Sequence, residues 1–183
     1  MIDEEKLSLA AKELGASSSG FINVSQIVFR QEFRKLCEAN RCGSYDRGWM
    51  CPPAVGDIEE LIEGVKKRSR AMVFSSVGKL VDSFDYKGMV ACGQNFAKLV
   101  QKMTVKVASE WLDNEILVLG AGPCRVCEKC AYLDNQSCLH PEQAVMSLEA
   151  NGVDVGQLAK LAGLKYNNGP NTVTYFGAVF FTP

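Results

Sequence analysis

The chain lacks most of the features that identify common enzymes and membrane proteins. Its 183 residues contain one histidine, His140, which leaves little scope for a histidine-rich metal site or a serine–histidine hydrolase. No apolar run approaches the roughly 18 residues that a membrane span needs, and the start Met-Ile-Asp-Glu-Glu-Lys is too polar for a secretory signal. The sequence therefore predicts no membrane partner and a place in the reducing cytoplasm.

An excess of charge is also missing. The 20 Lys and Arg residues are balanced by 21 Asp and Glu residues, which gives a formal net charge of −1. Because nucleic-acid-binding domains normally carry a basic excess or stripe, no nucleic-acid partner is expected. Hydrophobic residues make up 47% and charged residues 22%, as in ordinary globular proteins. Residues 1–183 are long enough for a substantial core and are expected to form a single domain.

Cysteine, in contrast, is abundant, and in a reducing compartment eight cysteines indicate metal or redox chemistry rather than disulfides. Four of them form what we call the main cysteine group: Cys124, Cys127, Cys130 and Cys138. The first three follow a C-x-x-C-x-x-C spacing, which in bacterial ferredoxins holds three corners of a [4Fe–4S] cluster. Zinc is the alternative, although its structural sites are usually built from two separate C-x-x-C pairs.

A second cysteine group comprises Cys37, Cys42 and Cys51, which lie within fifteen residues of a segment rich in glycine and proline. These three are also candidate ligands, although free cysteines are often simply buried as small hydrophobic residues. Two partitions into clusters stay open. Either the main group forms one site and the second group forms another with Cys92, or Cys51 completes the C-x-x-C-x-x-C centre and Cys138 joins Cys37 and Cys42.

Seven cysteines fall one short of the eight ligands that two [4Fe–4S] clusters take. Cys92 and His140 are the candidates for the missing ligand. Without either, one iron would be open to a small substrate, and the protein would be a candidate enzyme with Glu149 and Asp154 as possible acid–base groups. Cationic side chains lie within the cysteine loops and would raise a cluster's potential if they face it: Arg41, Arg47, Arg125 and Lys129.

Helical and strand patterns alternate along the chain. Helices are expected over 3–15, 31–39, 57–67 and 88–114, from Pro141 to Gly152 and from Asp154 to Gly163, and strands over 21–29, 71–77, 116–119 and 173–182. This order predicts an α/β (or α+β) fold, a mixed sheet of four to five strands with helices packed on it and two cysteine-rich loops. The strand over 116–119 leads directly into the main cysteine group.

Several linked motifs give the chain a specific resemblance over nearly its whole length. They are Cys42-Gly-Ser-Tyr45, Trp49-Met-Cys51-Pro52-Pro53, Gly122-Pro-Cys124-Arg-Val-Cys127-Glu-Lys-Cys130, Cys138-Leu-His-Pro141, Ser147-Leu-Glu149-Ala150-Asn-Gly152-Val-Asp154 and Asn171-Thr-Val-Thr-Tyr175-Phe. The chain resembles a family of predicted metal-binding proteins of unknown function from bacteria and archaea. The resemblance implies a metal, in the form of iron–sulfur, on the main and second cysteine groups, whereas Cys92 matches no position in these motifs.

The first functional hypothesis is a protein that carries one or two [4Fe–4S] clusters and passes electrons to or from a redox protein partner, because no nucleotide fingerprint is present. The alternatives are a redox enzyme with an open cluster iron that binds a small substrate, and a zinc-stabilised interaction module. The sequence leaves open whether the protein is an enzyme.

Overall fold

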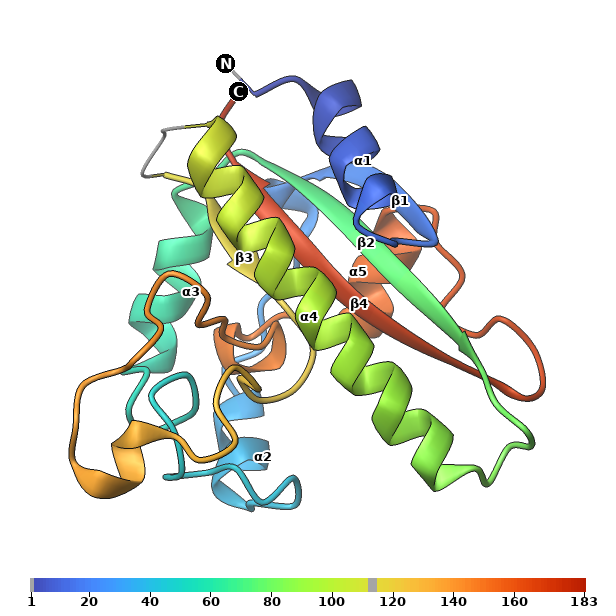
Figure 1. The fold of residues 1–183 in the computed structure, drawn as a ribbon. Helices are drawn as coiled ribbons and strands as arrows, with labels where there is room; N and C mark the ends of the chain where they lie inside the picture. Colours follow the sequence, from blue (N-terminus) through green and yellow to red (C-terminus); the bar gives the residue numbers. More distant parts are fainter. Residues whose placement is uncertain (1, 112–114) are drawn as a thin grey trace.

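A four-stranded antiparallel sheet separates two layers of helices (Figure 1). The computed structural model describes residues 2–111 and 115–183. The strands are β1 (Ser18–Asn23), β2 (Arg70–Lys79), β3 (Leu117–Leu119) and β4 (Thr172–Phe181), in the order β1-β2-β4-β3. The expected α/β fold with a sheet of four to five strands is confirmed, and every pairing within the sheet is antiparallel.

Both faces of the sheet are covered, which explains why β2 is apolar at consecutive positions. Met72 and Phe74 pack on one face with α1 (Glu4–Glu13) and α4 (Tyr86–Glu110). Ala71 and Val73 pack on the other face with α3 (Ile58–Lys66) and α5 (Val155–Leu161). Since successive strand residues point to opposite faces, a strand buried on both sides has no polar alternation.

Aspartate caps start the helices where the sequence predicts them. The carboxylate of Asp3 accepts the Glu5 backbone N–H at 3.0 Å, that of Asp57 accepts the Glu59 N–H at 2.7 Å, and that of Asp154 accepts the Gln157 N–H at 3.0 Å. Each cap satisfies a donor that has no partner within the first helical turn. The short helix expected over 31–39 is α2 (Phe33–Glu38).

The long helix α4 lies across the sheet with its apolar stripe inward (Figure 1). Phe96, Leu99 and Met103 are buried in the core, as their spacing predicts. The helix begins at Tyr86, two residues earlier than expected, and its expected end at 114 lies outside the described residues. Within the part of the chain that the structure describes, no helix has both the length and the apolarity to cross a membrane.

Two sequence-based expectations about secondary structure are wrong. The strand expected over 21–29 ends at Asn23, where the Gln26 side chain accepts the Asn23 N–H at 3.0 Å and the 3₁₀ turn η1 (Val24–Gln26) begins. The helix expected from Pro141 to Gly152 is also absent. Its residues Met146 and Leu148 instead bond to Gly120 at the end of β3, at 3.0 and 2.9 Å, and only the 3₁₀ turn η3 (Glu149–Asn151) follows. Backbone groups that extend a sheet cannot also form helical bonds.

We predict that Gly20→Ala lowers the free energy of unfolding by about 1–3 kcal/mol, the usual cost of overpacking. A Cβ on Gly20 of β1 would collide with the carbonyl oxygen of Ala162, at the end of α5. The matched control is Gly64→Ala in α3, where a Cβ meets nothing within 4 Å. That variant should gain about 0.5–1 kcal/mol of helix stability. Urea unfolding measures both, and a Gly20→Ala protein as stable as the wild type would contradict the packing described here.

Candidate metal centre

The two cysteine groups come from loops that are distant in sequence and adjacent in space (Figure 1). Cys37 is in the last turn of α2, and Cys42 and Cys51 follow in the loop before α3. The main cysteine group follows β3, in a loop that includes the 3₁₀ turn η2 (Ala131–Asp134). Both loops lie at the lower left of Figure 1, on the β3 side of the sheet.

The loop before α3 is shaped by backbone reversals that its residue types favour. Asn40, Gly43 and Asp46 have left-handed φ values of 50°, 73° and 56°, and asparagine, aspartate and glycine tolerate this region best. The Asn40 side chain accepts the Tyr45 N–H at 3.0 Å, and the Asp46 N–H donates to the Pro52 carbonyl at 2.8 Å. These bonds fold the loop back on itself.

Three contacts fasten the two loops together, and we call them the loop clasp. The Trp49 indole N–H donates to the Gln136 carbonyl oxygen at 2.9 Å. The Trp49 ring meets the Tyr132 ring edge-on, with centroids 5.0 Å apart and planes at 80°. The Tyr132 hydroxyl donates to the carboxylate of Asp46. Sequence reasoning missed Tyr132, Asp46 and Gln136, because nothing in the pattern of either loop indicates its partner.

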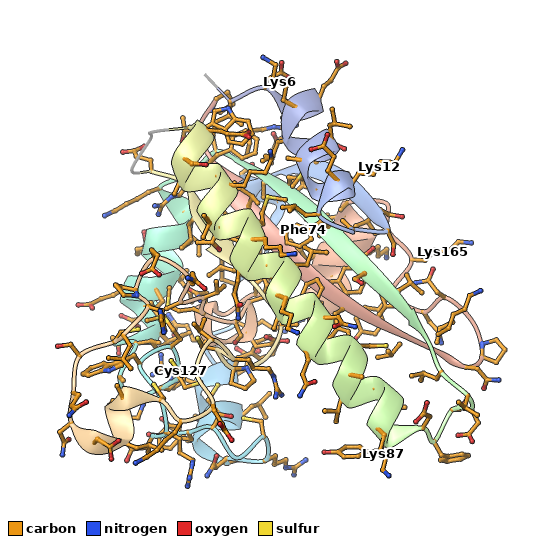
Figure 2. All side chains as sticks on the ribbon, viewed as in Figure 1. Lys6, Lys12, Phe74, Lys87, Cys127 and Lys165 are labelled. Atoms are coloured by element: carbon orange, nitrogen blue, oxygen red, sulfur yellow. The ribbon has the colours of Figure 1, made fainter. Side chains whose placement is uncertain are left out.

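Between the loops lies a cavity of about 740 Å³ that is lined by Cys51 together with the whole main cysteine group. Gly48 closes one side, where a Cβ would lie 3.5 Å from the Cys130 sulfur. The labelled Cys127 lies among these loops, far from Phe74 in the core (Figure 2). Four cationic residues and one acidic residue also line the cavity, namely Arg47, Lys98, Arg125, Lys129 and Glu128. The predicted cations at 47, 125 and 129 thus lie beside the thiols, joined by Lys98 of α4.

Cys51 connects the two groups electrostatically. Burial, and after it the neighbouring Cys42, Cys37, Cys124 and Cys130, together raise the pKa of its thiol to about 11. Two thiolates close together repel each other, so each one disfavours ionisation of the next. Cys51 therefore lies between the rest of the second group and the main group.

The remaining thiols with shifted pKa values complete this network. Burial raises the pKa of Cys37, which the Arg34 guanidinium lowers and Cys42 and Glu149 raise. Burial also raises the pKa of Cys127, with further contributions from the rest of the main group. All seven predicted ligands thus belong to one connected region.

Cys92 and His140, the two candidates for an eighth ligand, face elsewhere. The Cys92 sulfur packs on Gly78 of β2, and its charge would raise the pKa of Tyr175 on β4. His140 is half exposed, with Nδ1 3.9 Å from a Glu142 carboxylate oxygen. Neither lines the cavity. Asp154, which the sequence suggested as an acid–base group, caps α5, and its Oδ2 lies 3.3 Å from Nε of Arg30.

The donor set suits a thiophilic metal. All eight cysteines are free thiols, and seven of them surround or adjoin the cavity. In the conformation described for residues 2–111 and 115–183, no three His, Cys, Asp or Glu side chains converge tightly enough to hold an ion. The thiols therefore have to draw together around a metal, whose positive charge would replace their mutual repulsion with attraction. Of the seven predicted ligands, Cys51 and the main group line the cavity, and Cys37 and Cys42 act electrostatically on Cys51.

A family model described as a predicted metal-binding protein (DUF2284) matches residues 20–181, a span that includes both cysteine groups. The chain belongs to this family. The match confirms the resemblance found in the sequence, and it supports a metal-binding protein. No curated protein and no solved structure matches the chain.

We predict that in metal-free protein at pH 8 iodoacetamide alkylates Cys51 slowly. A pKa of about 11 instead of 9.0 reduces its thiolate fraction by about 100-fold. Mass spectrometry of the Cys51 peptide measures the rate, and the same peptide in urea-unfolded protein is the control. The pKa of Cys51 is higher in the folded protein than in the unfolded chain. The contribution of this thiol to the free energy of unfolding is therefore present below pH 9 and is lost as the pH rises toward 11. Equal rates in folded and unfolded protein would contradict this environment.

Proposed function

We propose that this protein carries one or two [4Fe–4S] clusters on its seven clustered cysteines and exchanges electrons with a redox protein partner in the cytoplasm. One observation carries the proposal: seven thiols from two loops form a single region around Cys51. A structural zinc ion takes four ligands and is then closed. Seven sulfur donors therefore exceed what one zinc ion requires, whereas the C-x-x-C-x-x-C run is the spacing that presents thiolates to a cubic cluster.

Electron transfer is supported by how the thiols lie relative to the surface. Cys42 is exposed, and the other six are only partly buried, so a bound cluster would be close to an approaching partner. The cationic side chains that line the cavity would favour the reduced, more negative state of a cluster. When bound, the cluster supplies one-electron exchange. The protein would hold it, partly shield it and set its potential.

A second candidate function, a redox enzyme, is favoured by the count of seven cysteines. With Cys92 packed on the sheet and His140 facing Glu142, two clusters would share seven thiolates. One iron would then lack a cysteine ligand and would be free to bind a small molecule.

The deciding experiment measures iron, acid-labile sulfide and zinc in protein purified without exposure to air, together with its visible absorption. We expect iron and sulfide in equal amounts and a brown protein. Zinc without iron would overturn the proposal and leave a zinc-stabilised interaction module. A cluster spectrum that cyanide changes would favour the enzyme over the electron carrier.

We predict that Cys127→Ser abolishes or strongly reduces metal content and lowers stability, because metal binding contributes to the free energy of folding. Cys92→Ser is the matched control. This variant also removes one partly buried sulfur, but the Cys92 sulfur lies against Gly78 rather than in the cavity. Cys92→Ser should therefore retain wild-type metal content. Metal analysis and thermal unfolding of both variants measure the difference. Full metal content in Cys127→Ser would refute the assignment of the main cysteine group.

A further inference from the structure

A second cavity, of about 510 Å³, opens beside the metal centre between the first turns of α4 and the strand β4. Its lining includes four aromatic residues, Tyr86, Tyr166, Tyr175 and Phe176. Arg125, which lies between Cys124 and Cys127 in the sequence, lines both this cavity and the thiol-lined one. Glu149 and Tyr175, which belong to two of the sequence motifs that contain no cysteine, therefore meet here, next to the main cysteine loop.

The aromatic walls are held in place by defined contacts. The Tyr175 hydroxyl donates to the Met89 carbonyl oxygen at 2.8 Å. Tyr166 stacks on Phe176 with centroids 5.7 Å apart and planes at 4°. Gly93 leaves room for Tyr175, since a Cβ there would lie 3.1 Å from the tyrosine oxygen. The cavity is therefore a built feature of the fold, with flat apolar surfaces that suit a planar ring.

Two charged groups supply polarity to these walls. Burial raises the pKa of Tyr175, and the Arg125 guanidinium, which lines the same cavity, opposes that rise. Among the residues that the structure describes, Arg125 has no acidic side chain within ion-pair distance. Glu149 also lines the cavity, and its buried Oε2 has no hydrogen-bond partner. A guanidinium without an ion pair suits a carboxylate, and a carboxyl oxygen without a partner suits a ligand hydroxyl.

We propose that this cavity binds a small aromatic carboxylate that also carries a hydroxyl group. The ring lies against the tyrosine side chains, the carboxylate pairs with Arg125, and the hydroxyl bonds to Glu149. Because Arg125 also lines the thiol cavity, a bound ligand lies next to the metal centre. Apart from Arg125 and its neighbours Ala121 and Gly122, the lining residues belong to α4, β4, η3, α5 and Tyr166, so the proposal does not rest on which metal the thiols hold.

The test is calorimetric titration of 4-hydroxybenzoate into the protein as purified. We expect saturable binding with a Kd of about 1 mM or tighter, within the range for a ligand of this size. The same ring without the negative charge, 4-hydroxybenzyl alcohol, should bind at least about tenfold more weakly, because it lacks the charge-assisted bonds to Arg125. An absence of saturable binding of 4-hydroxybenzoate, or equal affinity for the alcohol, would overturn the proposal.

Variants locate the binding on the structure. Arg125→Gln should weaken 4-hydroxybenzoate binding by about tenfold or more. Arg47→Gln, which changes an arginine that lines only the thiol cavity, is the matched control and should bind normally. Tyr166→Ala removes an exposed wall residue and should also weaken binding without unfolding the protein. Equal effects of the two arginine variants would refute the site. Iron content is measured on the same samples. It distinguishes failure of the ligand-site proposal, in which iron is present but binding is not, from failure of the iron–sulfur proposal, in which iron is absent.

Discussion

The loop clasp is the interaction on which the candidate metal centre depends. The two cysteine groups are far apart in the chain, and the thiols themselves repel one another once ionised, so they do not hold the loops together without a metal. The indole of Trp49 and the hydroxyl of Tyr132 do so instead, each through a hydrogen bond to the opposite loop. The edge-on contact between their rings adds attraction of the kind that aromatic pairs provide. A metal would therefore meet loops that are already adjacent.

The sheet determines where such loops are able to form. Helices cover the central apolar residues of β2 and β4 on both faces of the sheet. The metal centre therefore lies outside this packed core, on the β3 side of the sheet, on segments that are irregular in sequence. The short strand β3 ends at Leu119, and its backbone bonds continue through Gly120 to Met146 and Leu148. This pairing ties both ends of the main cysteine loop to the core.

The sequence indicated the features that depend on local chemistry. Asp3, Asp57 and Asp154 cap helices because their side chains accept nearby backbone donors, and the cysteine spacing marks the loops directly. The features that the sequence did not indicate are contacts between residues far apart in the chain. No local signal shows that Met146 and Leu148 bond to Gly120, and so a helix was expected there. Likewise, Tyr132 and Asp46 acquire their role only when two loops 86 residues apart meet.

Arg125 places the metal centre and the aromatic cavity in one electrostatic environment. Arg125 lines both cavities, and its guanidinium opposes the rise in the pKa of Tyr175 that burial causes. Any negative charge that accumulates on the thiol side would attract the guanidinium and weaken its hold on an anion in the aromatic cavity. An anionic ligand would in turn leave less positive charge for the metal centre. Since such a coupling is reciprocal, the ligand's affinity and the charge state of the centre would shift each other by the same free energy.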